Sequence, residues 1–189
     1  MDICLIRHGE TDWNVIGKLQ GREDIPLNEN GKLQAKHCGM SLSGTKWKSV
    51  VTSSLLRAKQ TADIIANVLN IHDIHTDTKL IERDYRKASG LTEKERNALS
   101  PDGKYEGMEE WSTLCDRVYK SIIKYADLFY PDNIIIVSHG SAINSILAKL
   151  SSHEIGSGKT RLKNACINML TYTNQLLNIK FYNKSYDDL

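Results

Sequence analysis

The fold is decided by a short apolar run that ends in charged and polar residues, Ile3-Cys4-Leu5-Ile6-Arg7-His8-Gly9. Consecutive apolar residues bounded by polar ones are typical of a strand that is covered on both faces of a parallel sheet. A second run of this kind is Ile134-Ile135-Ile136-Val137, and it is followed by Ser138-His139-Gly140. Both runs therefore predict buried parallel strands that end in a histidine followed by a glycine.

Amphipathic stretches alternate with these apolar runs. We expect helices over residues 28–42, 109–130 and 143–150, and another with Ser54 as its N-cap, because apolar side chains recur there at helical spacing. Further strands are expected near residues 50–53 and 74–81. Thr92 and Glu95 form a capping box that predicts a short helix. Two extended runs within residues 166–182 predict an antiparallel hairpin at one edge of the sheet.

These elements predict an α/β fold of three layers. Its mainly parallel sheet would carry helices on both faces and an antiparallel edge strand or hairpin near the C-terminus. The 189 residues contain no repeat, no low-complexity tract and only three prolines, so nothing marks a linker. Since domains usually contain about 100–200 residues, we expect a single domain, 1–189.

The composition excludes several classes of protein. The 25 basic and 23 acidic residues give a net charge of +2, which disfavours nucleic acid as a partner. A mean hydropathy of -0.41 with 40% hydrophobic residues indicates a globular chain. No apolar stretch approaches the ~20 residues that span a bilayer, and no signal peptide is apparent, so we expect a cytoplasmic protein without a membrane partner. The four cysteines lie far apart, which disfavours a disulfide framework or zinc site.

Polar residues gather where three predicted strands end. Arg7-His8-Gly9 follows the first strand, Ser53-Ser54 with Arg57 follows the second, and Ser138-His139-Gly140 follows the fourth. Because ligands of open α/β sheets bind at the carboxyl ends of the strands, we expect these groups to share one pocket. Arginine side chains and helix N-termini bind phosphate oxygens, and glycine lets a ligand approach the backbone. The pattern predicts a site for a phosphoryl group.

Two other motifs could indicate a different ligand site. Residues 153–160 imitate a phosphate-binding loop, but His153 replaces its first glycine and a helix precedes it, so we expect a surface loop. His72 and His75 have no third ligand at a diagnostic spacing and are expected at the surface. We therefore predict no metal site and no cofactor.

The chain resembles the histidine phosphatase superfamily, which includes the cofactor-dependent phosphoglycerate mutases. The resemblance covers nearly the whole chain in ordered blocks, namely residues 7–14 (Arg-His-Gly-Glu-Thr-Asp-Trp-Asn), 20–21, 24–27, 53–62, 80–82 and 138–140. Residues 82–85, 88–92 and 159–166 are similar to its broad-specificity bacterial phosphatase branch. The resemblance implies the family's α/β fold and phosphoryl-transfer chemistry.

The resemblance also implies roles for individual residues. His8 would attack phosphorus and form a phosphohistidine, and Glu82 would protonate the leaving alcohol. The oxygens of the phosphoryl group would be bound by Arg7, Arg57 and His139. The neighbouring arginines favour the neutral imidazole that this attack needs, by repelling a further positive charge. The remaining substrate-binding residues would be Asn14, Gln20, Gly21 and Gly140. We add two charged rim candidates, Arg86 and Arg161, of which Arg86 is a departure from the family pattern.

Three functions share these residues: a phosphomonoesterase, a mutase and a non-catalytic binder of phosphorylated ligands. The family's mutases carry additional chain near the acid block, whereas here only the 26 residues 83–108 separate Glu82 from Glu109. We therefore favour a phosphomonoesterase that acts on a small-molecule phosphate ester, with the mutase as the alternative. Both histidines, both arginines and the glutamate are present, which disfavours a mere binder. The physiological ester and the oligomeric state stay open.

One position departs from the family pattern. Arg86 stands where the related branch generally has glycine. Two readings are open for it: its side chain either points into solvent or lines the rim and attracts a second anionic group of the substrate.

Overall fold

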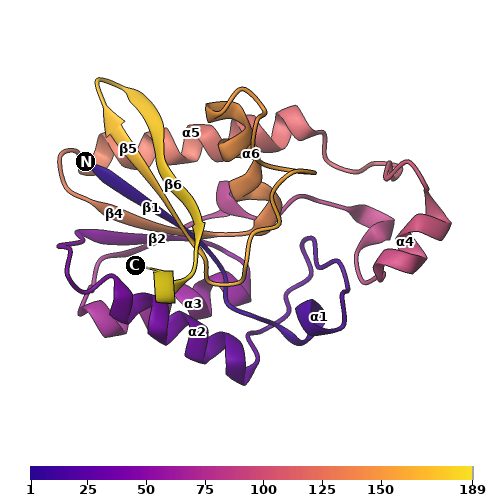
Figure 1. Ribbon diagram of the computed structural model, residues 1–189, viewed down its shortest axis with the longest axis horizontal. Helices are drawn as coiled ribbons and strands as arrows, with labels where there is room; N and C mark the ends of the chain where they lie inside the picture. Colours follow the sequence, from indigo (N-terminus) through magenta and orange to yellow (C-terminus); the bar gives the residue numbers. More distant parts are fainter. Residues whose placement is uncertain (189) are drawn as a thin grey trace.

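The structure is a computed structural model that describes residues 1–188. Six strands form one sheet in the order β3-β2-β4-β1-β5-β6 (Figure 1). The strands are β1 (Asp2–Arg7), β2 (Ser49–Ser53), β3 (Ile74–Asp77), β4 (Ile134–Ser138), β5 (Ile167–Thr173) and β6 (Leu176–Lys184). The α-helices are α1 (Asp12–Val15), α2 (Glu29–Ser41), α3 (Leu56–Leu69), α4 (Glu93–Leu99), α5 (Trp111–Phe129) and α6 (Gly140–Leu150). Short 3₁₀ turns are η1 (Thr78–Leu80), η2 (Arg86–Ala88) and η3 (Tyr186–Asp188).

The first four strands are parallel. β4 pairs with both β1 and β2, and β2 pairs with β3. β5 runs antiparallel to β1 and joins β6 in a hairpin. The two residues of its turn, Asn174 and Gln175, have φ values of 52° and 62°, as a tight hairpin turn requires. The predicted α/β fold with an antiparallel hairpin near the C-terminus is confirmed.

The sheet is covered by two pairs of helices (Figure 1). Alternate residues of a strand face opposite sides, so Ile3 and Leu5 of β1 pack into the core beneath α5 and α6, while Cys4 and Ile6 pack toward α2 and α3. The apolar run of β4 divides in the same way. This two-sided burial explains why both strands are apolar throughout.

Two element boundaries differ from the sequence prediction. The N-cap of α3 is Leu55 rather than Ser54, and its side chain makes no capping bond. Asp24 supplies the cap from a distant loop, because its carboxylate accepts a hydrogen bond of 2.5 Å from the Leu56 amide. The third extended segment is also shorter than expected, since β3 ends at Asp77 and turns into η1.

The segment that joins η1 to α5 carries α4 and extends beyond the carboxyl ends of the parallel strands (Figure 1). Of the helices in residues 1–188, none is both long and apolar enough to cross a membrane.

Candidate active site

The parallel strands bring the predicted histidines together at the carboxyl ends of β1 and β4. Arg7 lies opposite Ser138 in the β1–β4 ladder, and the His8 amide donates a hydrogen bond of 3.0 Å to the Ser138 carbonyl. The rings of His8 and His139 follow directly, with their centroids 5.3 Å apart. The expected meeting of the two histidines is therefore present.

His8 is held in one tautomer by its two neighbours. Its Nδ1 lies 2.7 Å from the Gly9 carbonyl oxygen, which can only accept, so Nδ1 carries the proton. Its Nε2 lies 3.2 Å from Nε of Arg57, which can only donate, so Nε2 carries the lone pair. Burial, together with the charges of Arg57 and Arg7, holds the pKa of His8 well below its usual value. The ring is thus a neutral base at neutral pH.

Arg57 is fully buried yet charged. Its Nη1 donates to the Glu23 carbonyl at 2.7 Å, and its Nη2 donates to the Gly21 carbonyl at 2.8 Å. Gly21 has a φ of 51°, and a Cβ there would lie 2.5 Å from the Ser89 hydroxyl. Burial lowers the pKa of Arg57 to about 10, which leaves the guanidinium protonated at neutral pH. Gly21 therefore acts in this structure by orienting Arg57.

Two further polar nitrogen atoms near His8 have no hydrogen-bond partner among residues 1–188. These atoms, Nε of Arg7 and Nδ1 of His139, are both buried. The other ends of the two side chains are anchored, because Arg7 Nη1 donates to the Leu162 carbonyl and His139 Nε2 lies 2.7 Å from the Ser53 hydroxyl. An unpaired buried polar group costs about 1–3 kcal/mol, which a bound anion would relieve at Arg7 Nε and, in the tautomer in which the Ser53 hydroxyl donates to Nε2, also at His139 Nδ1.

Glu82 caps the helix that follows His139. Its Oε2 accepts from the Ser141 amide at 3.0 Å, and its Oε1 accepts from the Ala142 amide at 3.1 Å. The expectation that free helix amides bind the phosphoryl group is thus wrong for these two, because a carboxylate already occupies them. The same holds at α3, where Asp24 takes the Leu56 amide. The amides of Ser141, Ala142 and Leu56 are therefore not free to bind a ligand in this structure.

A cavity of about 500 Å³ opens beside these groups. Arg7, Glu82 and Gly140 line it, while His8, Arg57 and His139 do not and are at most 3% exposed. Arg57 and the two histidines, whose pKa values are lowered by burial and by the neighbouring arginines, therefore lie buried next in the chain or in space to Arg7 and Gly140, which line the cavity. Its remaining lining comes from Leu19, Tyr85, Ser141, Asn144 and residues 157–162.

Asn14 and Gln20 lie in loops around this centre. The Asn14 side-chain oxygen accepts from the Thr11 amide at 3.2 Å and from Asn164 Nδ2 at 3.1 Å. These bonds fix the amide, whose nitrogen has no hydrogen bond within the described part of the chain. Gln20 is buried, and its side-chain oxygen is unpaired among residues 1–188.

The two rim arginines lie in different places. Arg161 is exposed and lines the cavity. Arg86 is 61% exposed and lies outside it, where its Nε donates to the Gly107 carbonyl at 3.1 Å and pairs with Asp84 at 3.3 Å. Its φ of 49° is the left-handed conformation that glycine adopts without strain. The structure does not bring Arg86 to the cavity.

Sequence reasoning missed several residues of the site. Tyr85 and Asn144 line the cavity, and the Tyr85 hydroxyl is hydrogen-bonded to Ser141. The loop at 157–160, expected at the surface, forms part of the rim. The sequence signal in this loop is the Gly-Lys-Thr at its end, which is typical of a nucleotide phosphate-binding loop and not of a phosphatase site. No group of three or more His, Cys, Asp or Glu side chains that could hold a metal ion occurs within residues 1–188.

Comparisons with known proteins agree with this geometry. The sequence model of the histidine phosphatase superfamily (branch 1) matches residues 3–185. The chain is 39% identical over 181 residues to a Bacillus subtilis (strain 168) protein named "Uncharacterized phosphatase PhoE", covering 96% of this chain and 93% of that protein. It is 32% identical over 184 residues to "Probable phosphoglycerate mutase GpmB" of Salmonella choleraesuis (strain SC-B67), covering 91% and 85% of the two chains. A mutant phosphoserine phosphatase of Entamoeba histolytica, solved in complex with phosphoserine, shares the fold with a TM-score of 0.81 at 23% identity, covering 97% of each chain.

Proposed function

Because the chain belongs to branch 1 of the histidine phosphatase superfamily, we propose that it is a metal-independent phosphomonoesterase that acts on small phosphate esters through a phosphohistidine intermediate. The observation that carries this proposal is the pair of unpaired buried nitrogens, Arg7 Nε and His139 Nδ1, beside the lone pair of His8. We assign the proton of the His139 ring to Nδ1, so that the Ser53 hydroxyl donates to Nε2 and both nitrogens are donors. A phosphoryl group offers the acceptor oxygens that these donors lack. A cytoplasmic location is part of the proposal, as the sequence predicts.

In the first step, His8 Nε2 attacks phosphorus in line with the departing ester oxygen. The P–N bond forms as the P–O bond to the alcohol breaks, and Arg7, Arg57 and His139 stabilise the charge on the equatorial oxygens. The phosphorus replaces Arg57 Nε–H as the partner of the lone pair. The Nδ1–H bond to Gly9 stabilises the positive charge that develops on the ring.

Glu82 would supply the proton for the leaving oxygen. Its Oε1 accepts from both the Arg83 and Ala142 amides, whereas Oε2 accepts only from Ser141. Oε2 also lies 3.8 Å from the position of a Cβ built on Gly140, a residue that lines the cavity. We therefore assign the proton transfer to Oε2.

In the second step, water replaces the alcohol. The Glu82 carboxylate accepts a proton from the water as its oxygen attacks the phosphohistidine, which breaks the P–N bond and releases phosphate. This restores both the neutral imidazole and the protonated acid, so the cycle consumes one ester and one water.

A mutase is the second candidate, because one relative is named as one. A mutase would return the phosphoryl group from His8 to a second hydroxyl instead of to water. The deciding experiment incubates the enzyme with ³²P-labelled esters, including phosphoserine and 3-phosphoglycerate, and follows released phosphate and transferred label together. We expect release of inorganic phosphate to dominate. Transfer that exceeds release would contradict the phosphatase assignment.

The rim arginines provide a matched pair for testing the substrate class. We expect Arg161→Gln to raise the KM about five- to tenfold for esters with a second anionic group, and to leave singly charged esters within about twofold, because Arg161 lines the cavity and surface charge acts over about 10 Å. Arg86→Gln removes the same charge outside the cavity and should leave the KM of both classes of ester unchanged. Steady-state kinetics at low and high salt check this, since salt should reduce the Arg161 effect. Equal effects of the two variants would exclude Arg161 as an anion-binding residue.

A further inference from the structure

The segment that carries Glu82 lacks regular secondary structure after η1, and side chains hold its backbone in place. The carbonyls of residues 79–82 all accept hydrogen bonds from side chains. Three of these bonds come from Arg117 of α5, and the fourth is donated by the Ser138 hydroxyl to the Leu80 carbonyl at 2.8 Å. The position of Glu82 therefore depends on bonds from distant parts of the chain.

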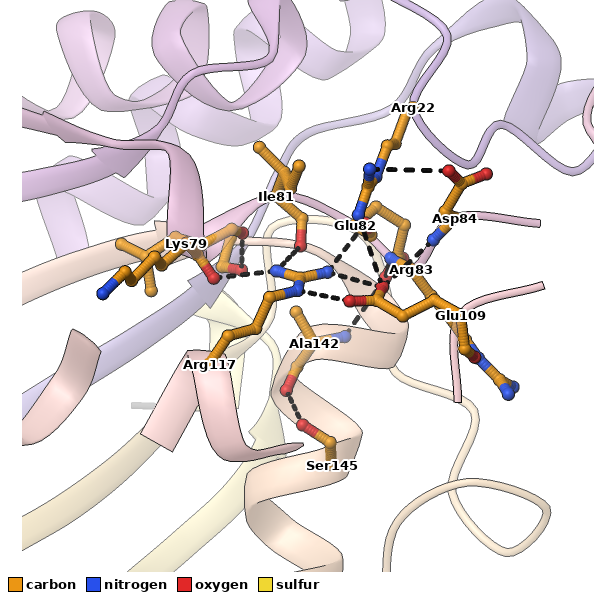
Figure 2. A network of polar contacts seen from close by, with 12 residues as sticks. Arg22, Lys79, Ile81, Glu82, Arg83, Asp84, Glu109, Arg117, Ala142 and Ser145 are labelled. Atoms are coloured by element: carbon orange, nitrogen blue, oxygen red, sulfur yellow. Dashed lines mark hydrogen bonds and ion pairs between the residues drawn. The ribbon is translucent and has the colours of Figure 1, made fainter. Parts of the chain in front are cut away.

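Arg117 uses all five of its N–H donors on this segment and on one carboxylate (Figure 2). Its Nη1 donates to the carbonyls of Lys79 and Ile81, both at 2.7 Å. Its Nη2 donates to the Glu82 carbonyl at 3.0 Å and to Glu109 Oε2 at 2.9 Å, while Nε donates to Glu109 Oε1 at 2.7 Å. A planar guanidinium suits this arrangement, because its donors point in fixed directions.

Glu109 holds Arg117 and also binds the chain beyond Glu82. Its Oε2 accepts from the Asp84 amide at 3.2 Å, and Arg22 lies 3.7 Å from the same oxygen. The Glu109 side chain is only 8% exposed. Burial raises the pKa of Glu109, but the hydrogen bond and charge of Arg117 outweigh burial and hold it below its usual value. The pair is thus a stable ion pair at neutral pH.

We propose that Arg117 is a positioning residue for Glu82. It fixes the backbone immediately before and at Glu82, while Glu109 fixes the amide two residues later. The carboxylate then lies at the N-terminus of α6, where it accepts from Ser141 and Ala142 beside the cavity. This inference rests on the proposed function, because it requires Glu82 to be the proton donor.

The test compares two esters that differ in their need for a proton. An alkyl phosphate has a basic leaving group, whereas 4-nitrophenyl phosphate has one that departs without help. We expect Arg117→Gln to lower kcat/KM, which reports only the steps up to the phosphohistidine, about 10–100-fold for the alkyl ester and less than about threefold for the nitrophenyl ester, since a displaced catalytic group costs about this much. Arg117→Lys, which keeps the charge but loses the planar fork, should show a smaller loss with the same selectivity.

Arg22→Gln is the matched control. It removes a positive charge from the same Glu109 oxygen but gives up no bond to residues 79–82. Its kcat/KM should stay within about twofold for both esters. In a Glu82→Gln background, adding Arg117→Gln should change the alkyl rate by less than about threefold, because the group that it positions has been removed.

Hydrogen exchange gives a readout that does not depend on activity. Peptides that contain residues 79–82 and 140–143 should exchange faster in Arg117→Lys and stay unchanged in Arg22→Gln, which loses only the ion pairs with Asp84 and Glu109. The thermal midpoint of each variant is measured alongside. Equal losses on both esters, or additive losses with Glu82→Gln, would refute the positioning role. If Glu82→Gln itself fails to distinguish the esters, the proposed role of Glu82 fails instead, so the two failures are separable.

Discussion

Replacing His8 by alanine is expected to abolish turnover, with a loss of at least about 10⁴-fold in kcat. The reason is geometric, because Nε2 of His8 carries the lone pair that faces the buried cations. The variant should also lose the alkali-stable, acid-labile phosphate that we expect on the wild-type protein. Quenching with a ³²P-labelled ester in alkali and in acid measures this directly.

The matched control is His72→Ala, which removes the same side chain from an exposed position away from the cavity. It should retain wild-type turnover and labelling. The His8 variant should still bind inorganic phosphate, because Arg7, Arg57 and His139 remain, and this binding shows that the pocket is intact. Turnover of His8→Ala within tenfold of wild type would exclude a covalent role for His8.

The sheet and the core of the site could be predicted because burial leaves a pattern in the sequence. A strand covered on both faces must be apolar throughout, so Ile3–Ile6 and the run at 134–137 were readable without other information. The carboxyl ends of parallel strands also lie on the same side of the sheet, and this predicts that His8 and His139 lie close together. Residues that follow such strands gain their positions from the backbone alone.

The surroundings of the site could not be predicted in the same way. Arg117 stands on α5 among residues of helical spacing, and its bonds reach carbonyls 35 to 38 positions earlier in the chain. Every residue has a backbone carbonyl, so a side chain that binds carbonyls does not require particular residue types at the positions it contacts. Such contacts therefore produce no sequence motif. The capping of α6 by Glu82 is likewise a long-range contact, and it explains why the helix amides expected for the ligand are occupied.

Arg86 shows why the direction of a side chain at the rim of the cavity could not be predicted from the sequence. Its left-handed φ fits the glycine that the family resemblance implies at this position, but the direction of its side chain is set by the Gly107 carbonyl and Asp84. Its backbone amide also donates to Asp84 at 2.9 Å. These local acceptors hold the guanidinium away from the residues that line the cavity, so a charge near the acid residue in sequence does not become a charge in the cavity.

The second large effect is expected for Glu82→Gln, whose kcat/KM for alkyl phosphates should fall about 10²–10⁴-fold, as the loss of a general acid predicts. For 4-nitrophenyl phosphate the loss in kcat/KM should stay below about tenfold, because nitrophenolate departs without a proton and kcat/KM does not include the later water step, in which Glu82 acts alike for every ester. Rates over a series of leaving groups of rising basicity measure the effect. The dependence on leaving-group basicity should steepen in the variant, since no proton offsets the growing charge.

The control for this prediction follows from the hydrogen bonds of the carboxylate. Glutamine can keep an oxygen toward Arg83 and Ala142, but its amino group would face the Ser141 amide as a second donor. A loss of helix capping, about 0.5–2 kcal/mol, therefore accompanies the loss of the proton. Glu82→Ala removes the cap as well as the acid, so its thermal midpoint should fall further than that of Glu82→Gln while its leaving-group dependence is the same. If the alkyl and nitrophenyl rates fall together and follow the thermal midpoints, Glu82 serves as a helix cap that shapes the pocket, and the proton must come from another donor.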